Sequence, residues 1–120
     1  MRWLLLVVFL FALSSPASAE VIGKKPFSFL GENLTVRLAT YGSGYRAQFG
    51  SVLQCFSEVQ ARTAMPTVFT MCDNGWAFTS AEWYGRVFVS MSGSGMQEIV
   101  TDDSVFAWLH RSVMAHDARQ

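Results

Sequence analysis

The chain has 120 residues, of which 51% are apolar and 15% are charged, and its nine basic and nine acidic side chains balance. This length allows one domain with a hydrophobic core of its own. A balanced charge without a basic patch argues against nucleic acid as a partner.

The first 19 residues have the features of a secretory signal peptide. Arg2 is their only charge, and Trp3–Leu13 is an unbroken apolar run. The stretch ends in the A-x-A pattern that signal peptidases cut, at Ala17–Ala19. As a helix, the run rises about 16 Å, whereas a bilayer core needs about 20 residues. We expect cleavage before Glu20 and an exported domain, periplasmic or secreted, over residues 20–120.

We expect no membrane span in the mature chain, because no later apolar run approaches the required length. Removal of Arg2 leaves eight basic and nine acidic side chains, a net charge of −1.

Cys55 and Cys72 are the two cysteines of the chain. In an oxidising compartment an even number of cysteines indicates a disulfide. Closing a loop of this length would stabilise the fold by about 3 kcal/mol. The alternative is two buried free thiols. No C-x-x-C motif or neighbouring His supports a metal or redox site, so we expect a Cys55–Cys72 disulfide.

The first part of the mature chain predicts strands. Residues 21–26 read as a leader into the fold, and Phe27–Leu30 as a short strand. Leu34–Tyr41 alternates apolar and polar residues, as a half-buried strand does. A Gly-Ser-Gly turn follows, and Tyr45–Phe49 is expected to return as the hairpin partner.

A helix is predicted to begin at Ser51 and to end before Pro66. Ser51 and Gln54 fit the S-x-x-Q capping box, which satisfies free backbone donors at a helix start. One apolar stripe at helical spacing is formed by Val52, Cys55, Phe56 and Val59. Cys55 is then expected on the buried face of this helix, with the disulfide tying it to a neighbouring strand.

Four strands and a second helix are expected beyond Pro66. The strands are Thr67–Cys72, Trp76–Ser80, Tyr84–Met91 and Met96–Val100. Asp73–Gly75 is the strongest hairpin-turn signal, because Asn and Gly tolerate positive φ. The second helix begins at Asp102–Ser104, whose acidic and hydroxyl side chains suit a helix N-terminus. The predicted fold class is α+β: a mostly antiparallel sheet of about five strands with one central and one C-terminal helix.

No catalytic or cofactor motif is expected. His110 and His116 are six residues apart and do not share a helix face well. Glu58 and Glu82 form a glycosidase pair only if the fold brings them together. The methionines are scattered rather than clustered for copper, and the glycine-rich turns lack the Lys-Ser/Thr of a phosphate loop. We therefore assign no catalytic residue, metal or cofactor.

Two segments are candidate binding surfaces. The stretch Trp76–Tyr84 has more large aromatic side chains than one strand face buries, so Trp76, Trp83 or Tyr84 is available as an anchor. The loop Ser92, Gly93, Ser94 and Gly95 allows close backbone approach. The plainer alternatives are core aromatics and a flexible connector. If Tyr84–Met91 pairs with Trp76–Ser80, the loop falls beside the Asn74-Gly75 turn, and loops gathered at one sheet end are common recognition sites.

The segment Met91–Gly95, followed later by Phe106 and Trp108, is similar to the S-G-x-G loop of periplasmic C-type lysozyme inhibitors. The resemblance covers fewer than about twenty residues, and the Tyr that follows in that motif is missing after Glu98. It implies that a loop of this kind on an exported domain can enter an enzyme cleft.

We expect a small exported binding module without enzymatic activity, of the inhibitor or immunity type, whose partner is another protein of the cell envelope or extracellular space. The alternatives are a small cell-envelope hydrolase and a structural or assembly accessory protein of the envelope. An enzyme predicts a concave pocket with converging polar groups, and a binding module predicts an exposed aromatic patch or a protruding loop.

Overall fold

The computed structural model describes residues 19–120, so the predicted signal peptide, apart from Ala19, lies outside the described residues. Eight strands are followed by one helix: β1 (Val21–Phe29), β2 (Glu32–Tyr41), β3 (Gly44–Phe49), β4 (Leu53–Ala61), β5 (Thr67–Cys72), β6 (Ala77–Trp83), β7 (Arg86–Met91), β8 (Gln97–Val100) and α2 (Val105–Ala118). Each strand pairs antiparallel with the next along the chain, which gives one sheet in the order β1 to β8.

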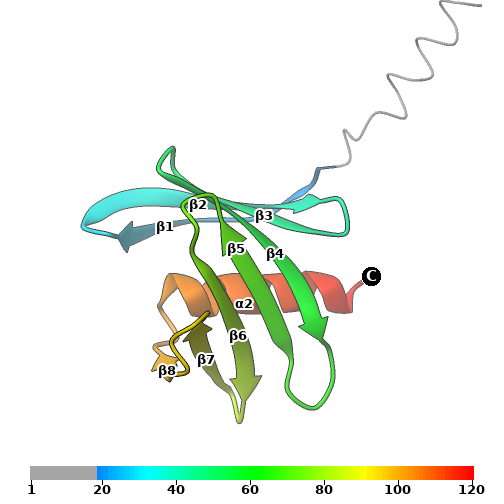
Figure 1. Cartoon of the computed structure of the whole chain (residues 1–120). Coiled ribbons are helices and arrows are strands. Elements are labelled where there is room, and N and C mark those ends of the chain that lie inside the picture. Colours follow the sequence, from blue (N-terminus) through cyan, green and yellow to red (C-terminus); the bar gives the residue numbers. More distant parts are fainter. Residues whose placement is uncertain (1–18) are drawn as a thin grey trace, which may run out of the picture.

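The sheet curls around α2, which lies along its concave side (Figure 1). At one edge, Phe27 of β1 packs against Trp108 of α2, with ring centroids 5.5 Å apart. The helix also contacts β4 to β7. The core lies between helix and sheet and contains Val36, Leu38, Phe49, Leu53, Val68, Phe78, Val89, Val105, Leu109 and Val113. This arrangement leaves the turns at both ends of the sheet exposed.

The predicted fold of about five strands with a central helix is wrong. The segment expected to be helical from Ser51 is strand β4, with both β3 and β5 as neighbours. Its buried residues Leu53, Cys55 and Ser57 alternate with exposed or half-buried ones. Ser57 is a buried position of the strand with a polar side chain, so the sequence does not show the apolar alternation expected of a strand. The apolar residues around it fit a helical stripe instead.

Ser57 is buried because a neighbouring strand supplies its hydrogen-bond partner. Its hydroxyl lies 2.8 Å from the Thr70 hydroxyl of β5, and both side chains are fully buried. A buried hydroxyl without a partner would be costly, so the pair makes the strand arrangement of β4 tolerable. The expected leader, residues 21–26, is likewise part of a strand, β1.

The Cys55–Cys72 disulfide is confirmed. The two cysteines are directly opposite each other in the β4–β5 register, so the bond joins two strands rather than a helix and a strand.

The C-terminal helix is also confirmed. The Ser104 hydroxyl accepts hydrogen bonds from the backbone N–H groups of Phe106 and Ala107, at 3.0 and 3.4 Å. These bonds satisfy donors that a helix start leaves free. Within residues 19–120, no helix has the length and apolar character needed to cross a membrane.

Candidate functional site

The structure divides the predicted binding residues between the two ends of the sheet. Ser92 donates its backbone N–H to the Ala77 carbonyl at 2.9 Å, so the Ser92–Gly95 loop lies beside the start of β6, as expected. Trp83 and Tyr84 lie at the far end of β6. The seven residues of β6 separate the two ends by about 20 Å, at about 3.3 Å per residue. One small partner surface therefore does not include both groups.

At the first end, Trp76 belongs to the rim of the core. It is half-buried, and its ring lies 6.3 Å from that of Phe29 in an edge-to-face contact. The Ser92–Gly95 loop beside it is exposed and is shaped by its own bonds, since the Ser94 hydroxyl donates to the Met91 carbonyl at 2.8 Å. This end presents backbone and hydroxyl groups but little free aromatic surface.

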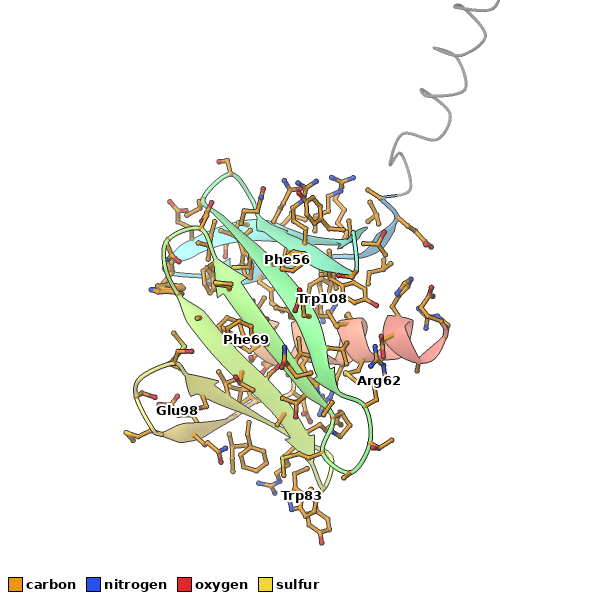
Figure 2. The ribbon with its side chains drawn as sticks, turned by 45° about the vertical axis from the view of Figure 1, so that its right-hand side comes forward. Phe56, Arg62, Phe69, Trp83, Glu98 and Trp108 are labelled. Atoms are coloured by element: carbon orange, nitrogen blue, oxygen red, sulfur yellow. A yellow bond between two sulfur atoms is a disulfide. The ribbon has the colours of Figure 1, made fainter. Side chains whose placement is uncertain are left out.

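At the other end, Trp83 and Tyr84 form an exposed pair that we term the aromatic tip. Tyr84 is 86% exposed and Trp83 is 43% exposed, and their rings pack edge to face with centroids 4.8 Å apart. Figure 2 shows Trp83 projecting from the end of the β6–β7 hairpin. Met65, also exposed, is close in the chain to Pro66, whose carbonyl accepts the Glu82 N–H at 3.0 Å. The backbone bond at Pro66 therefore places Met65, a further exposed apolar residue, near the end of β6.

The β6–β7 turn, which includes Tyr84, has a residue that is unfavourable for its backbone conformation. Tyr84 and Gly85 have φ values of 51° and 75°, and the flanking residues Trp83 and Arg86 are paired. A two-residue hairpin turn with both φ values positive favours Asn-Gly or Gly-Gly, since a bulky side chain is strained there. An aromatic residue therefore occupies a position whose backbone conformation is unfavourable for it.

His110 and Ser80 form a buried polar pair. The Ser80 hydroxyl lies 2.8 Å from His110 Nδ1, and Glu82 Oε1 lies 3.8 Å from His110 Nε2. These are the residue types of a hydrolase triad, but Ser80 is only 2% exposed, and it lines neither the pocket beside the end of α2 nor the one at the β3–β4 turn. That hydroxyl is buried beneath the surface, where it hydrogen-bonds to His110.

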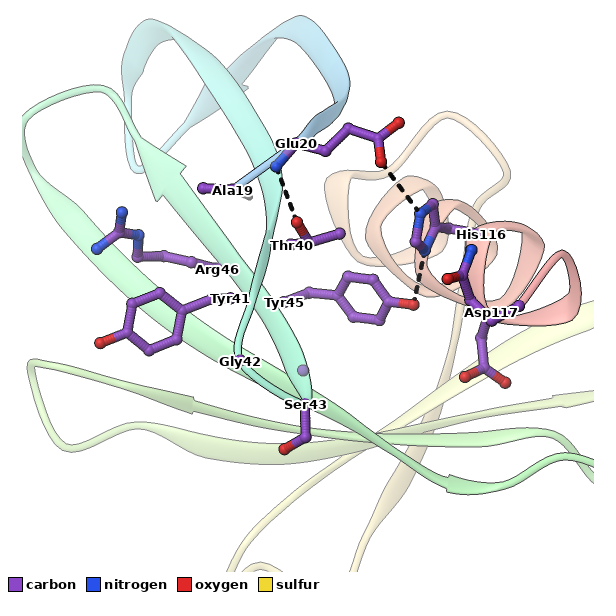
Figure 3. A pocket seen from close by; sticks show the side chains of 12 residues that line it. Ala19, Glu20, Thr40, Tyr41, Gly42, Ser43, Tyr45, Arg46, His116 and Asp117 are labelled. Carbon is purple, nitrogen blue, oxygen red and sulfur yellow. Dashed lines mark hydrogen bonds and ion pairs between the residues drawn. The ribbon is translucent and has the colours of Figure 1, made fainter. Parts of the chain in front are cut away.

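The larger pocket, of about 770 Å³, opens between the start of β1, the β2–β3 hairpin and the C-terminal end of α2 (Figure 3). Its floor contains Tyr45 and His116, both buried, with the Tyr45 hydroxyl 2.9 Å from His116 Nδ1. Burial, followed by the nearby Asp117 carboxylate, raises the pKa of Tyr45. The protonated phenol can donate to His116 Nδ1, and in a neutral ring with that arrangement the hydrogen lies on the second ring nitrogen.

That second nitrogen, His116 Nε2, lies 3.9 Å from Glu20 Oε2. This distance is too long for a direct hydrogen bond, so the carboxylate has capacity left to accept others. Asp117, in contrast, is held by Arg62 through two bonds of 2.7 and 3.1 Å. Of the two acids that line the pocket, Glu20 is the one without a close cationic partner.

Arg46 follows Tyr45 directly in β3, so its side chain lies on the outer face of the sheet, away from His116. The Arg46 guanidinium lies 4.8 Å from the centre of the Tyr41 ring, and Phe56 supports the same ring from its edge at 5.7 Å. Arg46 forms no salt bridge with the residues described. Figure 3 shows Arg46 and Tyr41 on one side, and Glu20 and His116 on the other.

This pocket was not predicted from the sequence. Its residues come from three segments far apart in the chain, residues 19–20, 40–46 and 116–120. In the sequence, His116 was considered only together with His110, as two histidines that do not share a helix face well. The single sequence signal was the close spacing of Tyr41, Tyr45 and Arg46 around a Gly-Ser-Gly turn.

Within residues 19–120, no group of three or more His, Cys, Asp or Glu side chains is arranged to hold a metal ion. No protein-family model, curated protein or solved structure matches the chain.

Proposed function

We propose that this protein is an exported binding module without enzymatic activity, and that it contacts another protein of the cell envelope or extracellular space through the aromatic tip. The proposal rests on one observation: Tyr84, 86% exposed, occupies a strained positive-φ position beside the exposed Trp83. Strain of this kind tends to occur at functional sites, where a side chain is needed despite its effect on stability.

The tip has the composition of an interface anchor. Trp and Tyr are enriched among the residues that contribute most to protein binding, because each buries a large area with few rotatable bonds. The pairing of β6 with β7 up to Trp83 and Arg86 holds them at the end of a regular hairpin, which limits the conformational entropy lost on binding. A partner with an apolar pocket would accept the two rings.

The test is affinity capture from the protein's own cell envelope and from neighbouring species, with mass spectrometry of the captured proteins. Wild type should retain a specific partner, and Trp83→Ala and Tyr84→Asn should lose it, since loss of an anchor costs about 2 kcal/mol or more. Capture of the same partner by both variants would contradict the proposal.

A matched control separates binding from stability. Leu30 and Gly31, in the β1–β2 turn, have φ values of 53° and 78°, the same backbone pattern as Tyr84 and Gly85. Leu30→Asn therefore relieves the same kind of strain away from the tip and should leave capture unchanged. Ser94→Tyr tests the opposite end of the sheet. If it alone prevents capture, the Ser92–Gly95 loop is the contact and the aromatic tip is not.

A further inference from the structure

Independently of the proposed function, we propose that part of the outer face of the sheet binds the surface of a bilayer that contains anionic lipids. This part, which we term the basic face, has three cations next to three apolar side chains. Its members lie on β2 to β5, apart from one lysine on β1: Lys24, Arg37, Arg46, Tyr41, Phe56 and Met71.

The strand register places the three cations on the side of the sheet that points away from α2. Arg37 lies between two residues of β2 that are fully buried in the core, so its side chain points outward. Lys24 is directly opposite Arg37 in the β1–β2 register and therefore shares its side of the sheet. Arg46 follows the buried Tyr45 in β3 and points outward for the same reason. The three cations thus extend over three neighbouring strands.

The apolar members of the basic face lie next to these cations. Arg46 is directly opposite Phe56 in the β3–β4 register, and Phe56 is directly opposite Met71 in the β4–β5 register. The Tyr41 ring contacts both the Arg46 guanidinium, at 4.8 Å, and the Phe56 ring, at 5.7 Å. Tyr41 is 50% exposed and Met71 is 54% exposed. The solvent side of an antiparallel sheet is usually polar, so this apolar surface calls for a partner.

The outer face of the sheet is basic, although the expected mature chain has one more acidic than basic side chain. In the part of the chain that the structure describes, the outward-facing strand positions have four cations and one acid: Lys24, Arg37, Arg46, Arg86 and Glu58. Within residues 19–120, no salt bridge involves any of the three cations of the basic face. Their positive charge is therefore available to an anionic partner.

A bilayer surface fits this arrangement better than a single acidic ligand does. The cations do not converge on one point but spread over β1, β2 and β3, which suits many equivalent phosphate groups. Long basic side chains reach the headgroups while apolar side chains beside them lie at the boundary with the acyl chains. Since the sheet curls around α2, its outer face is convex (Figure 1). A fluid bilayer adapts to this curve, whereas a rigid protein would need a concave acidic surface.

The start of the described chain also favours a bilayer as the partner. The Thr40 N–H donates to the Glu20 carbonyl at 2.9 Å, so the end of the predicted signal peptide lies beside Tyr41. Ala19 lines the same pocket as Tyr41 and Arg46 (Figure 3). A signal peptide enters the bilayer during export. Export would therefore bring this corner of the domain to the membrane surface.

The experiment is co-sedimentation of the purified exported protein with two kinds of vesicle, phosphatidylcholine alone and an equal mixture of phosphatidylcholine and phosphatidylglycerol. The protein should bind the anionic vesicles, bind the neutral ones weakly, and be released as salt screens the charges. Absence of binding to anionic vesicles at low salt would overturn the proposal. Equal binding to both kinds of vesicle would overturn it too.

Single variants assign the binding to the basic face. Lys24→Gln, Arg37→Gln and Arg46→Gln should each weaken binding to anionic vesicles by about fivefold, the usual contribution of one cation near such a surface. Lys25→Gln is the matched control, because Lys25 follows Lys24 in β1 and is opposite the buried Val36, on the side of α2. If Lys25→Gln weakens binding as much as Lys24→Gln, net charge alone explains it and the site assignment is wrong.

This test is separate from that of the proposed function. Met71 is opposite Ala77 at the start of β6, whereas Trp83 is at the end of that strand. Trp83→Ala should therefore lose partner capture and keep vesicle binding, and Arg46→Gln should do the reverse. If Arg46→Gln prevents capture of an envelope protein but leaves vesicle binding intact, the basic face is a protein contact and the lipid proposal fails.

Discussion

His110 makes folding stability depend on pH. Its Nε2 is the one buried side-chain nitrogen or oxygen in residues 19–120 without a hydrogen-bond partner. Burial, followed by the nearby Arg111 guanidinium, lowers the pKa of His110 to about 4. The Glu82 carboxylate, 3.8 Å from Nε2, also faces the ring. The neutral ring is thus preferred in the fold, where Ser80 contacts Nδ1.

We predict that acid destabilises the protein through this residue. An unfolded His titrates near pH 6.5, so between about pH 6.5 and 4 the unfolded chain binds a proton that the folded chain does not. The contribution of neutral His110 to the free energy of unfolding is therefore fully present above pH 6.5 and is lost as the pH falls through this window. At about 1.4 kcal/mol per pH unit, the loss amounts to up to about 3 kcal/mol. Urea unfolding at several pH values measures this slope.

The variant His110→Gln removes the titrating group and keeps a side chain that can hydrogen-bond to Ser80. Its free energy of unfolding should be lower at pH 7 but should change less between pH 7 and pH 5. Parallel curves for the variant and wild type over this range would show that other groups cause the pH dependence.

Gly44 is required by close packing rather than by its backbone angles. A Cβ atom there would lie 2.5 Å from the Ser57 carbonyl oxygen and 2.8 Å from the Phe56 ring. Because the first neighbour is backbone, the strands themselves would have to move. We predict that Gly44→Ala lowers the free energy of unfolding by about 1–3 kcal/mol. Ser43→Ala, in the adjacent exposed turn, is the control. A thermal melt in which both variants match wild type would contradict this reading.

At the scale of elements, the disulfide reinforces the hairpin that replaced the predicted helix. Cys55 and Cys72 close a loop with a sequence separation of 17. A constraint of this size stabilises by about 3 kcal/mol in the chain-entropy model. We predict that the double variant Cys55→Ala/Cys72→Ala loses about this amount in urea unfolding, and that reduced wild type behaves similarly. Equal stability of the oxidised and reduced protein would show that the paired strands alone hold the hairpin.

In the β6–β7 turn we predict a substitution that raises stability. Tyr84→Asn places a residue that tolerates positive φ in a turn that demands it, so stability should rise by up to about 1 kcal/mol. Partner capture should be lost at the same time. The melting temperature measures the first effect. A Tyr84→Asn protein that melts well below wild type would mean that the Tyr84 ring supports the hairpin and is not simply an exposed anchor.

At the scale of the whole molecule, the fold begins directly after the predicted cleavage point. Ala19 and Glu20 are exposed, and β1 starts at Val21. We predict that intact-mass analysis of the exported protein shows loss of residues 1–19 and a chain that begins at Glu20. All eight strands, α2 and the disulfide lie after that point. Recovery of a full-length, membrane-bound product would be evidence against cleavage.

Local signals in the sequence determined a large part of this molecule. The alternation of Leu34–Tyr41, the Asp73–Gly75 turn and the Ser104 helix start predicted elements that the structure contains, because each depends on neighbours in the chain. The Cys55–Cys72 pair followed from composition and the expected compartment alone.

Tertiary structure decided what local signals left ambiguous. Residues 53–61 satisfy both a helical and a strand spacing, and the outcome was set by backbone bonds from β3 and β5 together with the Ser57–Thr70 contact. The two candidate sites also differ in how far the sequence predicts them. The tip was visible in sequence as surplus aromatics, whereas the pocket joins Glu20, Arg46 and His116. Pairing of β1, β2 and β3 places Glu20 near Arg46, and packing of α2 against the sheet adds His116. No local periodicity encodes either contact, because both depend on segments far apart in the chain.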